Sequence, residues 1–428
     1  MNPPSSFTSS SDEKPARRRG WVTVAWIALW LVVIDVGVNV AFAYPSDPKN
    51  LQPNPLALFF DYGRSMEGRL RRITRPDPEA TAPITLAGWY DPLVAIRRPA
   101  KPGATEVTIY GMSHAVRLAD ALQTVSPKYQ ARSIGAPGAS TNWSYGAFLR
   151  DRERKQSKVA VLAIMSSTLP MILSPSPMDW NTSFAMPYTA DRFVETAGGL
   201  RQIKPPYESF SQYVRIANDP SAWDRALGQF AATDPFYDPL LFRENWLDNS
   251  SLGRLFRRAW SQRRDRAWRS RVLTAQNYDP ESESVRIANA IIADFALKAR
   301  SEGIVPVIYV IDSFGYGDQL SRALSGTLKR ERIPYLSTSQ YVDPRNPTAY
   351  LPDSHFTDAN DRKLAAALAR VMDRALVDED AGLRAVGQGN GAVARSSRGI
   401  CTGSAMRPGT GDGCERFAPK ASPGGKTG

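Results

Sequence analysis

The pattern of hydrophobic and polar positions divides the chain into three parts. Residues 21–43 are an apolar run that, as a helix, is long enough to cross a hydrocarbon core of about 30 Å. From about Glu106, short β-branched runs such as EVTIY, KVAVLAIM and VPVIYVI alternate with amphipathic helical stretches, and the last stretch ends near Met372. Strands separated by helices indicate right-handed βαβ units and a parallel sheet with helices on both faces. We therefore predict a three-layer α/β domain that follows one transmembrane helix.

The same pattern gives the predicted organisation along the chain. Between the α/β strands, about residues 170–279 are rich in Pro and Trp, contain no clear strand, and are predicted to be a large insertion over the sheet. We predict a cytoplasmic tail (1–20), a transmembrane anchor (21–43), a Pro-rich connector packed on the domain (44–105), the α/β domain (106–380) and a disordered Gly-, Ser- and Ala-rich tail (381–428).

One predicted helix of the insertion is strongly basic, GRLFRRAWSQRRDRAWRSR. Its apolar residues recur every three or four positions, which predicts one apolar stripe on a helix. The stripe consists of Leu252, Leu255, Phe256, Ala259, Trp260 and Ala267. Two interpretations remain open: a solvated basic helix that docks through its stripe, or a surface that binds polyanions or lipid head groups.

The flanks of the apolar run predict its orientation. Lys14 and residues 17–19, all arginine, precede it, and basic residues ahead of a span favour a cytoplasmic N-terminus. The alternative is a cleaved signal peptide, because Ala41, Phe42 and Ala43 match a cleavage site, although the run is longer than a typical signal core. Asp35 within the run is costly at mid-membrane, so it either faces a partner helix or lies near the outer interface.

Charge and cysteine content narrow the partners. The chain has 428 residues, a formal net charge of +12 and a pI of about 9.7, which alone suggests polyanionic partners. The predicted anchor places the domain outside the cytoplasm and therefore argues against nucleic acid. Cys401 and Cys414 are the only cysteines and could form a disulfide in an oxidising compartment; two free thiols are the alternative. Neither a metal site nor a cofactor is predicted, because no His or second Cys pair accompanies them.

Two short segments carry candidate chemistry. Strand EVTIY ends in GMSHA, so Ser113 lies on a tight turn that opens a helix. A serine there is either a nucleophile with its own amide as an oxyanion donor or a plain N-cap. The second segment, LPDSHFTDAND, precedes the last helix, which Thr357 or Asp358 can cap. It holds His355, one of only two histidines.

These segments predict a proton relay. Asp353 can hold the His355 imidazole by its Nδ1 proton, which leaves Nε2 free to take the hydroxyl proton of Ser113. The alternative is a surface aspartate beside a solvent-exposed histidine. His114 is the poorer base, because neighbouring residues at a helix start point apart.

Together the blocks resemble the SGNH/GDSL hydrolase superfamily, over about Glu106 to Met372. A Gly-x-Ser turn follows the first strand, a glycine-containing loop the second, a polar turn the third, and an Asp-x-His precedes the last helix. The anchor, the DSHF segment and the insertion resemble exported bacterial proteins that add or remove acyl groups on polysaccharides, such as alginate acetyltransferases. The resemblance implies an SGNH or flavodoxin-like sheet.

The resemblance also implies roles for individual residues. Ser113 would be the nucleophile, His355 the general base and Asp353 its orienting partner. Oxyanion donors would be Ser113 and Gly138, with Gly135 as the alternative to Gly138. The third block departs from the family: IMSSTLP stands where Gly-x-Asn-Asp is usual, so Ser166 or Ser167 must replace the asparagine amide, or that donor is absent. The first block also reads GMS in place of GDS.

The predicted function is therefore a serine esterase or O-acyltransferase, with acetyl as the expected group. It would act on cell-surface or exported polysaccharide from a single-pass position in the inner membrane, with its main domain in the periplasm. The resemblance implies a multi-spanning membrane protein as the acyl donor. Trp143, Trp180, Trp223 and Trp246 are compatible with sugar stacking, although most buried aromatic residues pack cores. The contrasting hypothesis is a non-catalytic polysaccharide-binding or assembly subunit of an export complex.

Overall fold

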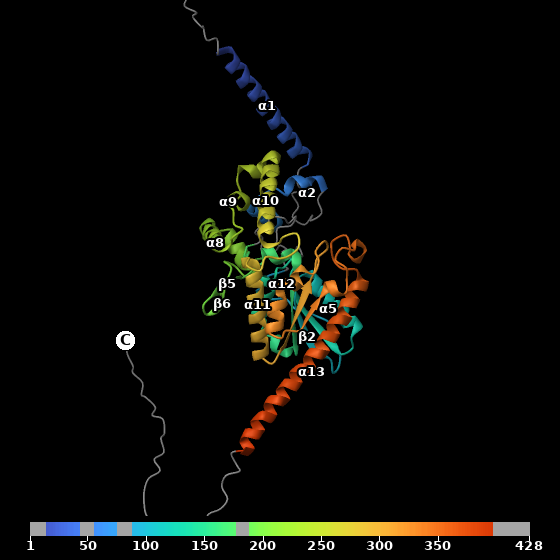
Figure 1. The fold of residues 1–428 in the computed structure, drawn as a ribbon. Coiled ribbons are helices and arrows are strands. Elements are labelled where there is room, and N and C mark those ends of the chain that lie inside the picture. Colours follow the sequence, from blue (N-terminus) through green and yellow to red (C-terminus); the bar gives the residue numbers. More distant parts are fainter. Residues whose placement is uncertain (1–13, 43–54, 75–87, 177–187, 397–428) are drawn as a thin grey trace, which may run out of the picture. The chain divides into compact units, whose positions relative to one another are not determined.

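The computed structural model describes residues 14–42, 55–74, 88–176 and 188–396 (Figure 1). The chain forms two compact units, Met1–Val377 and Asp378–Gly428. The sheet, the insertion and the predicted site residues Ser113, Asp353 and His355 all belong to the first unit.

A six-stranded sheet forms the centre of the first unit (Figure 1). Its order is β1-β3-β2-β4-β7-β8, and every neighbouring pair is parallel except β1 with β3. Nearly every residue of β4 and β7 is buried, as expected of central strands covered on both faces. The α/β class and the mostly parallel sheet are therefore confirmed. The strands are β1 (Ile96–Arg97), β2 (Thr105–Gly111), β3 (Tyr129–Gly135), β4 (Val159–Met165), β7 (Val305–Ile311) and β8 (Tyr335–Ser337).

The order of the strands divides the helices into two groups. The chain moves from β2 to β3 toward one edge and from β3 to β4 toward the other, so right-handed crossovers place α5 (Ser113–Val125) and α6 (Thr141–Arg150) on opposite faces. α11 (Glu283–Ser301) and α12 (Gln319–Arg330) join strands added in the same direction as β4, and α11 contacts both α6 and α12. α13 (Asp358–Ser396) is tied to α5 by ion pairs described below.

The insertion contains two strands that the sequence analysis missed. β5 (Arg192–Thr196) and β6 (Gly199–Ile203) form an antiparallel hairpin outside the main sheet. No residue of β6 is fully buried, so the hairpin lacks the apolar alternation that identifies a half-buried strand. The helical elements that follow are α7 (Phe210–Ala217), α8 (Pro220–Thr233), α9 (Pro239–Phe242), the 3-10 turn η3 (Trp246–Asn249) and α10 (Ser251–Val272).

The basic helix α10 forms as predicted, but it is buried through a different face. Leu252 and Phe256 of the expected stripe are exposed, whereas Arg254 and Arg257 are 7% and 1% exposed. Arg257 donates to Leu240 O at 2.7 Å and pairs with buried Asp248 at 3.0 Å. A buried guanidinium is acceptable only where such partners satisfy it. The prediction that the apolar stripe docks this helix was therefore wrong for its N-terminal half.

The N-terminal helix α1 (Lys14–Ala41) includes Gly20–Ala41, which is long and apolar enough to cross a membrane. Within the described residues it is the one helix that meets both conditions. Asp35 faces a helix of the same chain: its Oδ1 accepts hydrogen bonds from Leu252 N at 2.7 Å and Ser250 Oγ at 3.1 Å in the first turn of α10. The described part of the connector forms α2 (Pro55–Asp61), α3 (Met66–Thr74) and the edge strand β1, and α3 packs into the core through Met66 and Leu70. The main sheet therefore begins within the segment predicted to be a connector.

At the C-terminal end, α13 continues through Ser396. Helical structure therefore extends past residue 380, where the sequence analysis ended the domain. Leu364, Leu368 and Met372 are fully buried, as expected of the amphipathic stretch predicted to end near Met372. Cys401 and Cys414 lie outside the described residues, so their disulfide stays a prediction.

Candidate active site

Ser113 stands at the junction of β2 and α5. The strand ends at Gly111, where an added Cβ would lie 2.6 Å from the side chains of Ala115 and Ala163, so glycine lets the helix pack against the sheet. Met112 occupies the N-cap position, and Ser113 is the first helical residue. The alternative in which Ser113 is a plain N-cap is therefore wrong. Its N–H belongs to the first turn, whose amides have no acceptor inside the helix.

His355 lies on a short closed loop before α13. Tyr350 and Phe356 form an isolated antiparallel bridge, and Leu351 N donates to His355 O at 2.7 Å. At the tip, Ser354 adopts a φ of 68°, a left-handed conformation that is uncommon for residues other than glycine. The loop turns Asp353 back onto its own histidine, so this short segment holds both side chains.

The structure brings Ser113, His355 and Asp353 together. His355 Nε2 lies 2.6 Å from Ser113 Oγ, and His355 Nδ1 lies 2.9 Å from Asp353 Oδ2. A carboxylate can only accept, so Nδ1 carries the proton and Nε2 is free to accept the hydroxyl proton of Ser113. Residues 242 positions apart thereby form one hydrogen-bonded relay.

Asp353 differs from a buried orienting carboxylate. Hydrogen bonds from the His355 side chain and backbone lower the pKa of Asp353 below its ordinary value, so it is ionised at neutral pH. However, its side chain is 64% exposed, and solvent screens its charge. Asp353 therefore acts mainly by orienting the His355 ring, and its charge contributes little.

The other histidine packs against the relay without joining it. The His114 ring centroid lies 4.7 Å from that of His355, and its Nε2 lies 3.3 Å from Ser354 O. Burial, and next the charge of His355, lower the pKa of His114 to about 4, so the ring is neutral at pH 7. Its Nδ1 is buried and has no hydrogen-bond partner among the described residues. His114 therefore supports the tip of the loop through Ser354.

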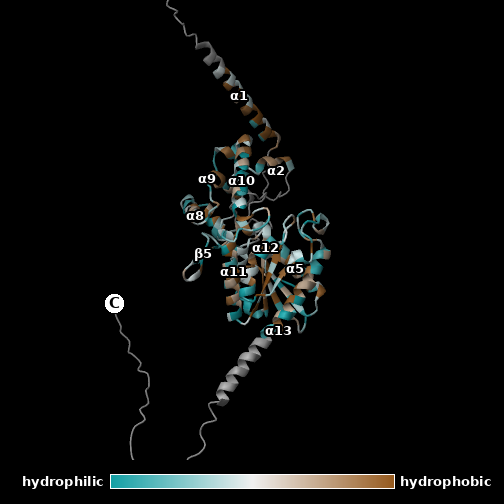
Figure 2. Cartoon of the chain, viewed as in Figure 1, coloured by the Kyte–Doolittle hydropathy of each residue, from teal (hydrophilic) through white to brown (hydrophobic). Residues whose placement is uncertain are grey.

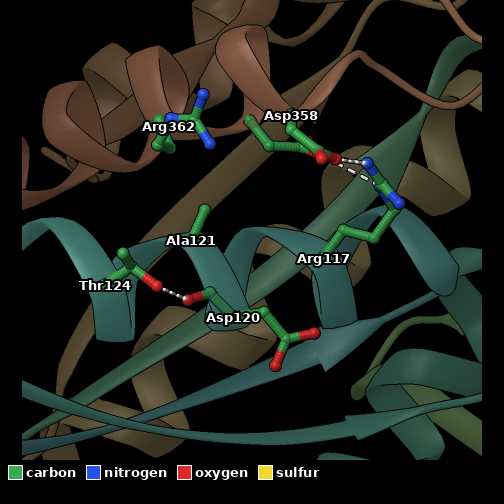
Figure 3. A pocket seen from close by; sticks show the side chains of 7 residues that line it. Arg117, Asp120, Ala121, Thr124, Asp358 and Arg362 are labelled. Carbon is green, nitrogen blue, oxygen red and sulfur yellow. Dashed lines mark hydrogen bonds and ion pairs between the residues drawn. The ribbon is translucent and has the colours of Figure 1, made fainter.

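An arginine that the sequence analysis missed connects α5, which carries Ser113, to the segment that follows His355. Arg117, one turn after Ser113 on α5, donates to Phe356 O at 3.1 Å and pairs with Asp361 at 2.8 Å and Asp358 at 2.7 Å (Figure 3). These groups line a surface hollow of about 290 Å³ together with Asp120, Ala121, Thr124 and Arg362. Burial raises the pKa of Asp361 to about 6, and Arg117 opposes that rise. The i, i+4 spacing from Ser113 to Arg117 was the signal in the sequence.

The predicted oxyanion donors Gly135 and Gly138 lie at the end of β3 and in the loop that follows it. Gly138 has a φ of 64° and is exposed in the loop after β3. Gly135 is held by packing, because an added Cβ would lie 2.7 Å from Val116.

Ser166 is engaged elsewhere. It is fully buried after β4; its Oγ donates to Ser313 Oγ at 3.1 Å and accepts from Ser313 N at 2.8 Å. Ser313 Oγ in turn donates to Ser167 Oγ at 3.0 Å. Both serines of the third block are therefore bonded to the loop after β7. Ser313 went unnoticed in the sequence because it belongs to no motif.

The tryptophans considered for sugar stacking differ in how far they are exposed. Trp143 and Trp223 are buried in the core, Trp246 is 75% exposed, and Trp180 lies outside the described residues. The stretches covered by the structure contain no group of three or more His, Cys, Asp or Glu that could hold a metal ion.

Comparison with known proteins adds no assignment. No protein-family model matches the chain, and no curated protein sequence matches it. Function must therefore be argued from the geometry of the site.

Proposed function

We propose that the chain is a membrane-anchored serine esterase or O-acyltransferase with a three-layer SGNH-type domain. The observation that carries the proposal is the relay from Ser113 Oγ to His355 Nε2 at 2.6 Å and from His355 Nδ1 to Asp353 at 2.9 Å. Both contacts have hydrogen-bonding geometry suited to proton transfer.

In the proposed reaction, His355 Nε2 takes the proton of Ser113 Oγ as that oxygen attacks the carbonyl carbon of an acyl ester. The tetrahedral intermediate collapses when His355 returns the proton to the leaving alcohol oxygen, which leaves an acyl group on Ser113. Water or a sugar hydroxyl then attacks the acyl carbon, and His355 removes the proton of the attacking group. The bond between the acyl carbon and Ser113 Oγ breaks, and His355 returns the proton to Ser113 Oγ. Hydrolysis and transfer differ only in this acceptor.

The developing oxyanion requires donors near Ser113. The first-turn amides of α5, beginning with Ser113 N–H, are the best candidates, because helix geometry leaves them without internal acceptors and the helix dipole favours negative charge there. The loop around Gly138 follows the neighbouring strand β3 and would supply a second amide. One lost donor typically lowers the rate about 10²- to 10³-fold, so without Ser166 a slow or specialised enzyme is expected.

Location and substrate rest on the sequence. The basic cluster ahead of the Gly20–Ala41 span favours a cytoplasmic N-terminus and a periplasmic domain. The resemblance to exported polysaccharide acetyltransferases favours an acetylated polysaccharide as substrate. A transferase would also need a multi-spanning membrane partner as its acyl donor.

The test is active-site labelling of the full chain in detergent micelles with a serine-reactive fluorophosphonate. Labelling is expected on Ser113, is lost in Ser113→Ala, and falls strongly in His355→Ala. Ser321→Ala, at another serine in a first helical turn, is the matched control and should label as the wild type does. Labelling that persists in Ser113→Ala would overturn the proposal. Release of acetate from acetylated polysaccharide then separates hydrolysis from transfer.

A second function has a specific observation in its favour. Ser166 Oγ donates to Ser313 Oγ and accepts from Ser313 N, so the Ser166 hydroxyl is not available as an oxyanion donor in this arrangement. This fits a non-catalytic polysaccharide-binding or assembly subunit. Binding of polysaccharide that is unchanged in Ser113→Ala, with no labelling of the wild type, would favour this alternative.

A further inference from the structure

Two polar residues of the apolar helix α1, Asp35 and Asn39, form hydrogen bonds with the N-terminal end of α10. Asp35 accepts hydrogen bonds from Leu252 N and Ser250 Oγ, and one turn later Asn39 Oδ1 accepts from Arg254 Nη2 at 2.8 Å. A carboxylate at a helix N-terminus satisfies an otherwise unpaired amide and complements the helix dipole. The first turn of α10 is therefore fixed to α1 at the level of Asp35 and Asn39.

This contact gives the depth of α10 relative to the apolar stretch. Asp35 lies six residues before Ala41, the end of the stretch, which is about 9 Å along a helix. The hydrocarbon core is about 30 Å thick, with head groups beyond it. If the 22 residues of Gly20–Ala41, about 33 Å of helix, cross that core, the first turn of α10 lies on the hydrocarbon side of the head groups, within about 9 Å of the end of the span.

Exposed apolar side chains are concentrated around that turn, on what we call the tip surface. Of the eleven large hydrophobic residues exposed outside α1 in the described chain, five lie on α2, η3 and the N-terminal half of α10. Figure 2 colours parts of α2 and of α10 as hydrophobic. The five are Leu56 (52% exposed), Phe59 (44%), Trp246 (75%), Leu252 (36%) and Phe256 (58%).

Contacts tie these elements to each other and to the end of the span. The guanidinium of Arg258 lies 4.5 Å from the Phe59 ring centroid, which joins α10 to α2. Phe42, just after α1, stacks on Phe60 of α2 at 5.5 Å. The tip surface is thus continuous with the C-terminal end of α1.

We propose that the tip surface inserts into the interfacial region of the leaflet at the C-terminal end of α1. Tryptophan and phenylalanine favour this region, and arginine can reach lipid phosphates from it. α10 buries Arg254 and Arg257 and exposes Leu252 and Phe256, the reverse of a water-facing helix, and lipid accounts for that inversion. The inference rests on the membrane anchoring proposed above, but not on the proposed chemistry.

The test uses the full chain with Cys401→Ser and Cys414→Ser, reconstituted in nanodiscs of phosphatidylethanolamine and phosphatidylglycerol. An environment-sensitive fluorophore is attached to Phe256→Cys in α10 or Phe59→Cys in α2. Val33→Cys inside the span is the positive control, and Leu297→Cys, 68% exposed on α11, is the aqueous control. Spin-labelled lipids should quench positions 33, 256 and 59 and leave position 297 unquenched.

The controls separate the ways in which the idea can fail. If lipid quenches the fluorophore at position 33 but not those at positions 256 and 59, the membrane anchor is supported and insertion of the tip surface is refuted. If position 33 is not quenched, anchoring itself fails, and the inference with it. If 256 and 59 resist both the lipid quencher and aqueous iodide, a protein covers the tip, and lipid insertion is again refuted. Circular dichroism and thermal unfolding of each variant report whether it is folded, independently of any enzymatic activity.

Discussion

His355 is held chiefly by its own neighbours in the chain. Asp353 binds both its Nδ1 and its backbone N–H, and the bridge from Tyr350 to Phe356 closes the loop. A local turn of this kind orients the imidazole without burying the carboxylate. Asp353 should therefore matter less than a carboxylate in a dry site.

This argument predicts a moderate effect of Asp353→Asn. An asparagine of the same shape can still accept from Nδ1, and the exposed charge it replaces is screened by solvent. The rate of fluorophosphonate labelling should fall by far less than the ~10⁴-fold known for a buried triad aspartate. Measured second-order rate constants for wild type, Asp353→Asn and Asp353→Ala decide this; a loss near 10⁴-fold would mean that the carboxylate is dehydrated in the working enzyme.

The buried ring of His114 should remain neutral over the physiological pH range. Burial lowers the pKa of His114 to about 4, so its ring should show no chemical-shift change between pH 5 and pH 8. With only two histidines in the chain, proton NMR of the imidazole region, assigned with His355→Ala, can test this. Its folded pKa lies below the unfolded value near 6.5, so His114 reduces stability progressively as pH falls from about 6.5 to 4. A His114 midpoint above 6 would contradict the buried environment.

Among the elements, α5 and α13 define the site by how they are joined. Ser113 begins α5, His355 precedes α13 by three residues, and Arg117 connects the two through Phe356 O, Asp358 and Asp361. Arg117 is thus a positioning residue, since its side chain binds Phe356 O, Asp358 and Asp361 beside the relay.

Replacing Arg117 should loosen the serine–imidazole pair while leaving the fold intact. We expect Arg117→Gln to slow labelling about 10-fold, because small displacements of reacting groups are costly. It should lower the free energy of unfolding by about 1–3 kcal/mol, because Asp361 is only 4% exposed and loses its cation, whereas Asp358 is exposed. Arg362→Gln, on the rim of the same hollow, is the control and should label normally. Equal effects of the two changes would refute the positioning role.

A second prediction at this scale concerns α10, where replacing a buried arginine should cost more stability than replacing an exposed phenylalanine. Arg257→Leu leaves Asp248 without its buried cation and should destabilise the protein by about 3 kcal/mol. Phe256→Ser, at the adjacent but exposed position, should cost less than about 1 kcal/mol. Denaturant unfolding of the full chain in detergent, followed by circular dichroism, compares them. If Phe256→Ser proves the more harmful, the burial pattern of α10 is wrong.

At the scale of the whole molecule, buried carboxyls shape the response of stability to pH. Asp234 is 4% exposed and accepts hydrogen bonds from Ser174, Ser176 and Phe236. Burial nevertheless raises the pKa of Asp234 to about 6. The folded protein therefore binds this proton more tightly than the unfolded chain, whose aspartates titrate near 3.9. Stability contributed by the protonated form is lost as pH rises from about 4 to 6.

Asp234→Asn should remove that dependence. Relative to wild type, the variant should gain about 2–3 kcal/mol of unfolding free energy between pH 4 and pH 7. Asp224→Asn, at a carboxylate that is 63% exposed, is the control. Thermal unfolding at several pH values provides the measurement, and parallel curves for wild type and Asp234→Asn would rule out a raised Asp234 pKa.

Much of the architecture follows from local sequence patterns. The β-branched runs become β2, β4 and β7, the stretch after His355 becomes α13, and the apolar run becomes α1, because periodicity and length are properties of contiguous residues. The hairpin β5–β6 was missed because only two of its residues are buried, which leaves no apolar alternation in the sequence. The direction of edge strand β1 depends on β3, its distant partner.

The candidate site shows the same division between local and distant information. Asp353 and His355 are two residues apart, so the chain itself determines that they interact. That His355 reaches Ser113, 242 residues away, was an expectation until the folded chain placed α5 beside α13. Tertiary structure alone decided that Ser166 bonds to Ser313, that Arg117 connects α5 to the segment around Phe356, and that α10 buries Arg254 and Arg257. Each depends on which distant groups satisfy a buried charge or hydroxyl, and hydrophobic patterning carries no information about those partners.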